Sequence, residues 1–113
     1  MSGRDRIILQ KIAKYINEAL SYTQGMGFNA FSQDSKTMSA TAFVLGQIGE
    51  LAKEISSEVT TAYPEIPWKG MRGMRNRIVH DYENVDLAML WDVIANDLPD
   101  LLTQIGSLLD KDK

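Results

Sequence analysis

One short segment of the chain, residues 74–82, combines residue types that can act on a phosphodiester. It contains an arginine, Arg75, the one histidine of the sequence, His80, and a phenol, Tyr82. Histidine can both take up and release a proton near neutral pH. An arginine beside it can stabilise the negative charge that develops on a phosphoryl group during the reaction. The segment therefore predicts phosphodiester chemistry, with Arg75 and His80 as the catalytic pair.

These residue types suit RNA without a metal ion. RNA carries its own nucleophile, the 2′-hydroxyl group, so a base, an acid and a positive charge are sufficient. The sequence has no cysteine, which excludes disulfides and thiolate zinc sites, and a single histidine makes another transition-metal site an unfavourable interpretation. We expect no metal and no cofactor. The absence of cysteine also fits a reducing cytoplasm.

The charge is distributed unevenly along the chain. The formal net charge is −3, which is unusual for a general nucleic-acid binder, because such proteins neutralise phosphates with basic residues. Residues 69–77 nevertheless form a local basic segment without any acidic residue. We expect its other basic side chains to contact RNA: Lys69, Arg72 and Arg77.

The spacing of the catalytic pair raises a geometric problem. On a straight helix, positions five apart diverge by about 140°, so Arg75 and His80 do not share a face. They can converge if the helix loosens before His80, if the long arginine side chain wraps around, or if the site forms across a two-fold dimer interface. We favour a combination of the first and third routes, since a two-fold axis would bring two such motifs into one cleft.

Apolar residues at three- and four-residue steps predict the elements that position this segment. They indicate helices over about residues 5–23, 35–62, 71–81 and 87–109, with Asp86 as the N-cap of the last. Residues 28–35 read as a connection, and Pro64 and Pro67 end the second helix. We therefore expect an all-α bundle of four or five helices that forms a single domain over residues 1–113. No apolar run reaches the roughly 18 residues of a membrane span, and no secretion leader is evident.

Two details within the helices also lead to expectations. The stripe of the last helix continues through Pro99, which predicts either one helix kinked near Ala95 or two shorter helices. Gly46 and Gly49 lie inside the second helix, where each costs about 1 kcal/mol relative to alanine. Close approach of another backbone is the usual reason for such a cost.

A less specific interpretation exists for most of these residues. The arginines can form a solvated face, His80 can be a cap or a surface residue, and Tyr82 can be an ordinary half-buried aromatic. Trp68 and Trp91 fit the core or an interface better than a ligand platform. Glu50 and Glu54 resemble exposed charges, although a polar role for Glu50 near the cleft stays open because it follows the glycine pair.

Residues 74–82 resemble the R-x-x-x-x-H-x-Y motif of HepT-type toxins of the HEPN superfamily. Arg75, His80 and Tyr82 match the motif, and Asn76 matches the polar residue that commonly follows the arginine. Four further segments resemble the family in the same order, so the similarity covers nearly the whole chain: residues 46–52, 63–68, 85–86 and 96–99.

The resemblance implies properties that residue spacing does not. Such toxins are helical homodimers that cleave RNA without metal, with the two motifs facing one cleft. Each is paired with an MNT-type nucleotidyltransferase antitoxin, and in some pairs the antitoxin transfers AMP to the motif tyrosine, here Tyr82. Carried over, Arg75 stabilises the scissile phosphate, His80 transfers protons and Asn76 helps hold the site.

The resemblance thus implies a cytoplasmic, metal-independent endoribonuclease toxin. The main alternative is a non-catalytic HEPN-type module that binds a nucleotidyltransferase and its substrate. A third hypothesis is a structural bundle whose glycine-lined helix serves only to form a dimer.

Overall fold

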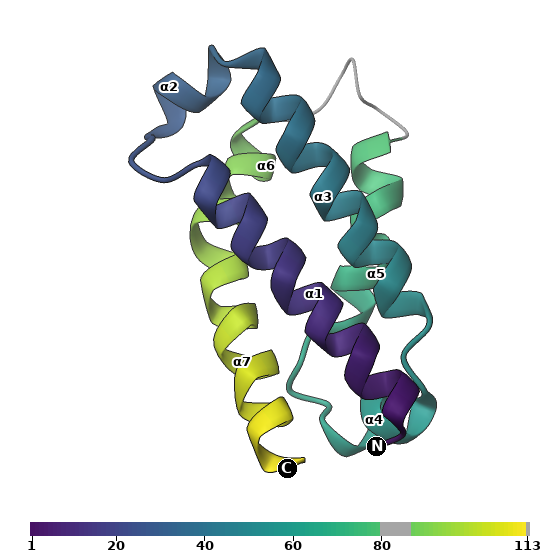
Figure 1. Ribbon diagram of the computed structural model, residues 1–113. Helices are drawn as coiled ribbons and strands as arrows, with labels where there is room; N and C mark the ends of the chain where they lie inside the picture. Colours follow the sequence, from purple (N-terminus) through teal and green to yellow (C-terminus); the bar gives the residue numbers. More distant parts are fainter. Residues whose placement is uncertain (80–86, 113) are drawn as a thin grey trace.

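The computed structural model describes residues 1–79 and 87–112, and every regular element in those two stretches is helical. Short helices, α2 (Phe28–Ser32) and α4 (Ser57–Ala62), connect longer ones. The long segments are α1 (Gly3–Tyr22), α3 (Ser35–Lys53), α5 (Trp68–Val79) and a continuous run of α6 (Leu87–Asp92), a π-helix (Val93–Asp97) and α7 (Leu98–Lys111) (Figure 1). The expected all-helical bundle is confirmed, and its four long segments correspond to the four predicted ones.

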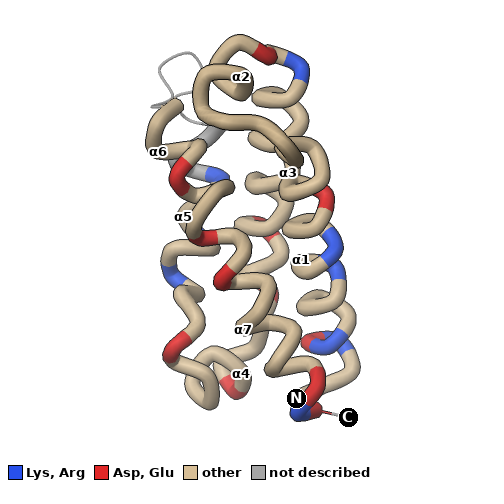
Figure 2. The backbone as a smooth tube through the Cα atoms, turned by 90° about the vertical axis from the view of Figure 1, so that its left-hand side faces the viewer, with Lys and Arg blue, Asp and Glu red and all other residues tan. Residues whose placement is uncertain are grey.

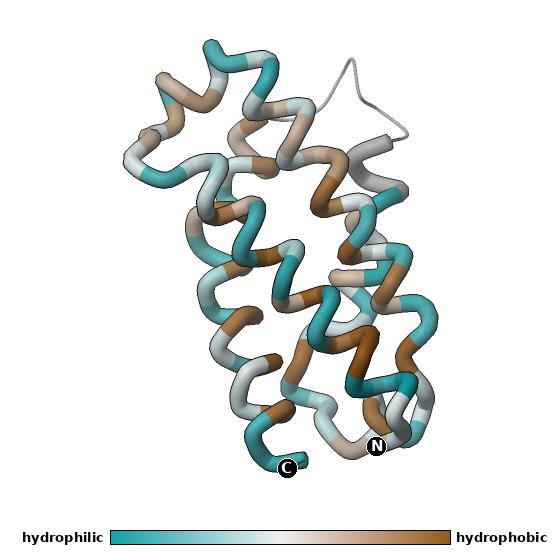
Figure 3. The backbone as a smooth tube through the Cα atoms, in the orientation of Figure 1, coloured by the Kyte–Doolittle hydropathy of each residue, from teal (hydrophilic) through white to brown (hydrophobic). Residues whose placement is uncertain are grey.

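Helix α3 is the centre of the bundle. It packs against α1 on one side and α5 on the other, while α1 also packs against α7. Apolar residues recur at intervals along each of these helices, as the hydropathy colouring shows (Figure 3). The largest fully buried side chains come from all the long segments and include Leu9, Ile12, Ile16, Leu45, Ile48, Met71, Ile94, Leu98, Ile105 and Leu108.

Trp68 belongs to this core, and Trp91 is partly buried and packs against it. Trp68 is 6% exposed, and its indole Nε1 donates a hydrogen bond of 2.9 Å to the carbonyl oxygen of Tyr63. Trp91 lies 5.2 Å from the ring of Phe31, which is fully buried. The interpretation as a core residue is confirmed for Trp68, and Trp91 lies at the edge of the core.

The predicted helix over residues 35–62 is wrong at its C-terminal end, because it divides into α3 and α4. Asp5, in the first turn of α1, binds the junction between them. Its carboxylate accepts hydrogen bonds from the backbone N–H of Ser56 at 3.0 Å and from the Ser56 hydroxyl at 2.7 Å. Ser56 is thereby held in an extended conformation, with φ −66° and ψ 154°, and α4 starts anew after it.

The connection predicted over residues 28–35 also contains structure. Residues 28–32 form α2, which places Phe31 in the core. Asp34 then caps α3, since its carboxylate accepts a 3.0 Å hydrogen bond from the backbone N–H of Thr37.

Pro99 has the predicted effect on the last segment. The five residues before α7 form a π-helix over Val93–Asp97, which includes Ala95. Because a proline has no N–H, the carbonyl four residues earlier loses its helical partner. The expected irregularity near Ala95 is confirmed. The expected N-cap Asp86 lies outside the described residues, and none of the described helices is long and apolar enough to cross a membrane.

Candidate active site

The basic helix α5 is held against α3 at a glycine. A Cβ atom at Gly49 would lie 3.0 Å from both the backbone nitrogen of Arg75 and the carbonyl oxygen of Met71. The close approach of a second backbone, predicted for the glycine pair, is therefore confirmed for Gly49. For Gly46 the prediction is wrong within the described residues, because a Cβ there would have no atom of another backbone within 4 Å.

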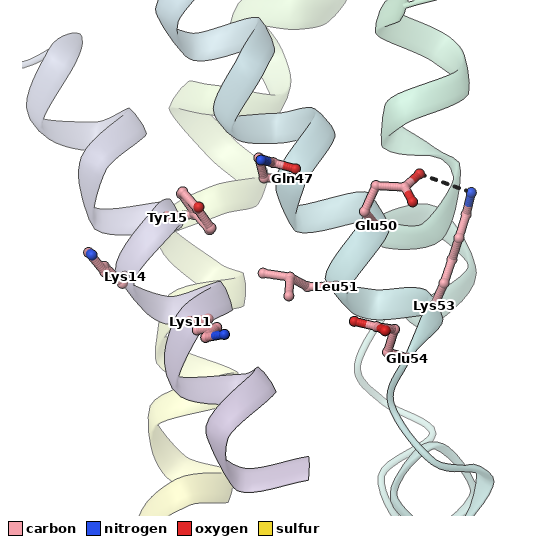
Figure 4. A pocket seen from close by; sticks show the side chains of 8 residues that line it. All are labelled: Lys11, Lys14, Tyr15, Gln47, Glu50, Leu51, Lys53 and Glu54. Carbon is pink, nitrogen blue, oxygen red and sulfur yellow. Dashed lines mark hydrogen bonds and ion pairs between the residues drawn. The ribbon is translucent and has the colours of Figure 1, made fainter. Parts of the chain in front are cut away.

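Arg75 lies on α5 beside this contact, with 51% of its side chain exposed. Its Nη1 donates a hydrogen bond of 3.0 Å to Oε1 of Glu50 on α3. The same carboxylate oxygen accepts a hydrogen bond of 3.2 Å from Nζ of Lys53, one turn further along α3 (Figure 4). Glu50 thus joins two cations from two helices.

The charge of Glu50 is favoured by these neighbours. The hydrogen bond from Lys53, together with the positive charges of Arg75 and Lys53, outweighs the opposing effect of desolvation and holds the pKa of the Glu50 carboxyl below its usual value. The carboxylate is therefore ionised across the neutral pH range. A negatively charged Glu50 attracts the guanidinium of Arg75 and accepts its hydrogen bond.

The other predicted RNA contacts on α5 differ in their surroundings. Lys69 is exposed at the start of the helix. Arg72 is partly buried, and its Nε donates a hydrogen bond of 3.4 Å to the carbonyl oxygen of Ala52, near the end of α3. The cations Lys53, Arg72 and Arg75 thus gather at the C-terminal end of α3, where the helix dipole favours positive charge.

Acidic residues concentrate on a different part of the bundle. The run Leu87–Asp112 carries five aspartates and one lysine, whereas the charged residues of α5 are all basic. Figure 2 shows the side of the bundle on which these aspartates lie along α6 and α7. The basic side chains Arg72 and Arg75 instead contact α3, so they face a different neighbour. Among the described contacts, the guanidinium of Arg75 pairs with Glu50 and with none of these aspartates.

The remaining predicted site residues can be placed only in part. Asn76 and Arg77 belong to α5, and their side chains are outside the described part of the structure. His80 and Tyr82 both lie outside the described residues. Helix α5 continues through Val79, so the helix does not loosen between Arg75 and Val79 in the way the first route to convergence requires.

Lys53 is the neighbour of Arg75 that the sequence interpretation missed. Glu50 and Lys53 are three apart on one helix, a spacing typical of an ion pair. That spacing was the available signal, but the approach of Arg75 from α5 depends on tertiary packing. Next to Glu50, a shallow groove of about 430 Å³ runs between α1 and α3, with Lys11 and Tyr15 on its α1 side (Figure 4).

The site as described can bind an anion through the exposed part of a guanidinium. Within the described residues, no group of three or more histidine, cysteine or acidic side chains is placed to hold a metal ion.

The family model described as "Ribonuclease HepT-like" matches residues 12–108 of the chain. The protein belongs to the HepT-like ribonuclease family.

Individual relatives of this HepT-like protein are named as ribonucleases as well. "Probable ribonuclease HepT" of Thermococcus cleftensis is 37% identical over 93 residues, which is 82% of this chain and 84% of the relative. "Putative RNase MJ0127" of Methanocaldococcus jannaschii is 30% identical over 104 residues, covering 92% of this chain and 86% of the relative. "Putative RNase TTE0752" of Caldanaerobacter subterraneus is 29% identical over 108 residues, 96% of each chain.

No solved structure matches this HepT-like chain. The family nevertheless confirms the expected membership and the expected class of enzyme, an endoribonuclease acting on RNA.

Proposed function

We propose that this HepT-like ribonuclease cleaves RNA without a metal ion and that Arg75 and His80 are its catalytic residues. The observation that supports it best is the exposure of Arg75 together with its hydrogen bonding. Its guanidinium is half exposed and held through Nη1 alone among the described contacts. The rest of its N–H fork can therefore bind a phosphate, which prefers two parallel N–H···O bonds.

In this mechanism the 2′-oxygen of the RNA attacks the adjacent phosphorus atom. The proton of the 2′-hydroxyl passes to a base, and the P–O5′ bond breaks as an acid protonates the leaving 5′-oxygen. The products are a 2′,3′-cyclic phosphate and a 5′-hydroxyl group. His80 transfers the protons, and Arg75 stabilises the additional negative charge on the phosphoryl oxygens.

We place the reaction in a cleft between two copies of the chain. On a regular helix, positions five apart diverge by about 140°, and α5 is regular as far as Val79. The chain also has a single histidine, whereas the reaction uses both a base and an acid. A two-fold axis would supply a second His80 and would let Arg75 of one protomer meet His80 of the other.

We also assign the protein the role of a toxin, neutralised by an MNT-type nucleotidyltransferase antitoxin. Family membership supports this role. Transfer of AMP to Tyr82 would place bulk and negative charge two residues from His80 and would repel the RNA polyanion. Mass spectrometry after incubation with the antitoxin and ATP should find one AMP on Tyr82; an unmodified Tyr82 in an inhibited complex would indicate inhibition by blocking alone.

The chemistry is tested with two matched RNA substrates. One is unmodified RNA, and the other carries a 2′-deoxy nucleotide on the 5′ side of the scissile phosphate. We expect the first to give a cyclic phosphate and a 5′-hydroxyl end, and the second to resist cleavage at that position. Cleavage of both would contradict the 2′-hydroxyl mechanism. Binding of both without any cleavage would instead favour the non-catalytic module.

A further inference from the structure

Glu50 connects the two helices that build the site. Its Oε1 lies 3.0 Å from Nη1 of Arg75 and 3.2 Å from Nζ of Lys53. The preceding residue, Gly49, is where the backbones of α3 and α5 come so close that a Cβ would be 3.0 Å from Arg75 N. Because the two backbones are in direct contact there, the position of the Glu50 backbone relative to α5 is well defined, and its carboxylate reaches the guanidinium of Arg75 from that position.

The geometry leaves Arg75 able to act while it is held. A guanidinium has five N–H donors in one plane, and among the described contacts Glu50 uses one of its nitrogen atoms, Nη1. The remaining edge can bind a phosphate at the same time. An arginine with half its side chain in solvent would otherwise sample many rotamers, and holding it in one of them before the substrate arrives favours reaction.

A second ion pair at the same end of α3 provides a comparison. Glu54 receives a hydrogen bond from Arg4 of α1 at 3.2 Å, and both of these side chains are exposed, at 52% and 69%. Glu54, which directly follows α3, therefore has the same charge as Glu50 and also an arginine partner. The partner of Glu54, however, belongs to α1, whereas the partner of Glu50 is the proposed catalytic arginine.

We propose that Glu50 is a positioning residue for Arg75, holding the guanidinium in the orientation that binds the scissile phosphate. This inference rests on the proposed catalytic role of Arg75. Glu50 touches neither the substrate nor the reacting atoms in this account. Lys53 shares the oxygen of Glu50, and its ammonium keeps the surroundings of Arg75 positive despite the carboxylate.

The test compares Glu50→Gln, Glu50→Ala and the control Glu54→Gln with the wild type and Arg75→Ala. Single-turnover cleavage at saturating enzyme measures the chemical step. Binding of an RNA with a 2′-deoxy scissile nucleotide measures affinity separately. We expect Glu50→Gln to lower the cleavage rate by roughly tenfold and Glu50→Ala by up to about 100-fold. Glu54→Gln should keep the wild-type rate.

Affinity should change in the opposite direction. Removing a negative charge near a phosphate favours RNA binding, so the Glu50 variants should bind the deoxy RNA as tightly as the wild type or more tightly. A variant that merely disrupted the fold would lose both rate and affinity. Equal rates for Glu50→Gln and Glu54→Gln would overturn the inference, and a faster Glu50→Gln would instead make Glu50 a brake on Arg75.

A spectroscopic readout keeps the inference separate from the proposed function. The Nε–H resonance of Arg75, assigned by its loss in Arg75→Lys, reports the order of the guanidinium in the free protein. We expect it to shift and broaden in Glu50→Ala and to be unchanged in Glu54→Gln. An unchanged resonance in Glu50→Ala would overturn positioning. If Arg75→Ala cleaved RNA like the wild type, the proposed function would fail, and with it any catalytic meaning of the contact.

Discussion

Gly49 of α3 faces the backbone of Arg75 with no space for a side chain between them. A Cβ there would lie 3.0 Å from Arg75 N and 3.0 Å from Met71 O. Both are backbone atoms, so neither can give way by a rotamer change. This contact sets the distance between the central helix and the helix that carries the proposed site.

Gly49→Ala should therefore separate α3 from α5. We expect the free energy of unfolding to fall by about 1–3 kcal/mol, the usual cost of overpacking, and RNA cleavage to fall as Arg75 moves from Glu50. Gly46→Ala, one turn away with no described atom within 4 Å, is the matched control. It should stabilise the helix by about 1 kcal/mol. Urea unfolding measures both, and equal effects of the two variants would contradict the account.

Asp5 should make stability depend on acid pH. Burial favours the neutral form of its carboxyl, but hydrogen bonds from Ser56 and from the Ser2 region outweigh burial, so the pKa of Asp5 is lowered. A lowered pKa gives stability that is present above the unfolded value of about 3.9 and lost as the pH falls through the folded value. Asp5→Asn should therefore reduce the dependence of the free energy of unfolding on pH in this range, as measured by urea unfolding at several pH values.

The contact of Asp5 is also expected to matter at neutral pH. Asp5→Ala leaves the N–H and hydroxyl of Ser56 without their carboxylate, and we expect a loss of about 2 kcal/mol in urea unfolding at pH 7. A variant as stable as the wild type at pH 7 would show that the α3–α4 junction is held by other contacts.

We expect two arginines of α5 to have different roles, Arg72 a structural role and Arg75 a catalytic one. Arg72 is partly buried and donates to the Ala52 carbonyl oxygen, so Arg72→Ala should lower the free energy of unfolding by about 1 kcal/mol. Arg75→Ala removes an exposed ion pair, and such pairs contribute little to stability. Its melting temperature should stay at the wild-type value while cleavage is lost. A destabilised Arg75→Ala would make Arg75 a structural residue.

A dimer cleft predicts complementation between two inactive chains. In a mixed dimer of Arg75→Ala and His80→Ala, one site would combine His80 of the first chain with Arg75 of the second. We expect the mixture to regain part of the wild-type cleavage, whereas each variant alone stays inactive. A mixture as inactive as its components, with mixed dimers demonstrated by native mass spectrometry, would place Arg75 and His80 in one chain.

The sequence was informative wherever apolar periodicity was long. The stripes of α1, α3 and α7 persist over several turns, and their helices lie where the periodicity predicts them. The division between α3 and α4 could not be predicted in this way, because it depends on Asp5, 51 residues from Ser56. The five-residue helix α2 is too short for periodicity to indicate.

The candidate site, too, could be predicted from the sequence only in part. Arg75 was identified from its type and its neighbours in sequence, since a motif is a local pattern. The attachment of Arg75 to Glu50, 25 residues away, depends on the packing of α5 on α3. The glycine pair indicated close packing of the helix without saying which glycine makes the contact, because the sequence does not give the direction in which each one faces.

The most direct test of the central claim uses the protein purified alone. Labelled RNA is incubated in excess chelator with the wild type, Arg75→Ala and His80→Ala, all three shown to have the same circular dichroism spectrum. The account predicts that the wild type cleaves the RNA and that both variants are inactive. Wild-type cleavage that requires a divalent cation, or equal cleavage by all three proteins, would contradict it.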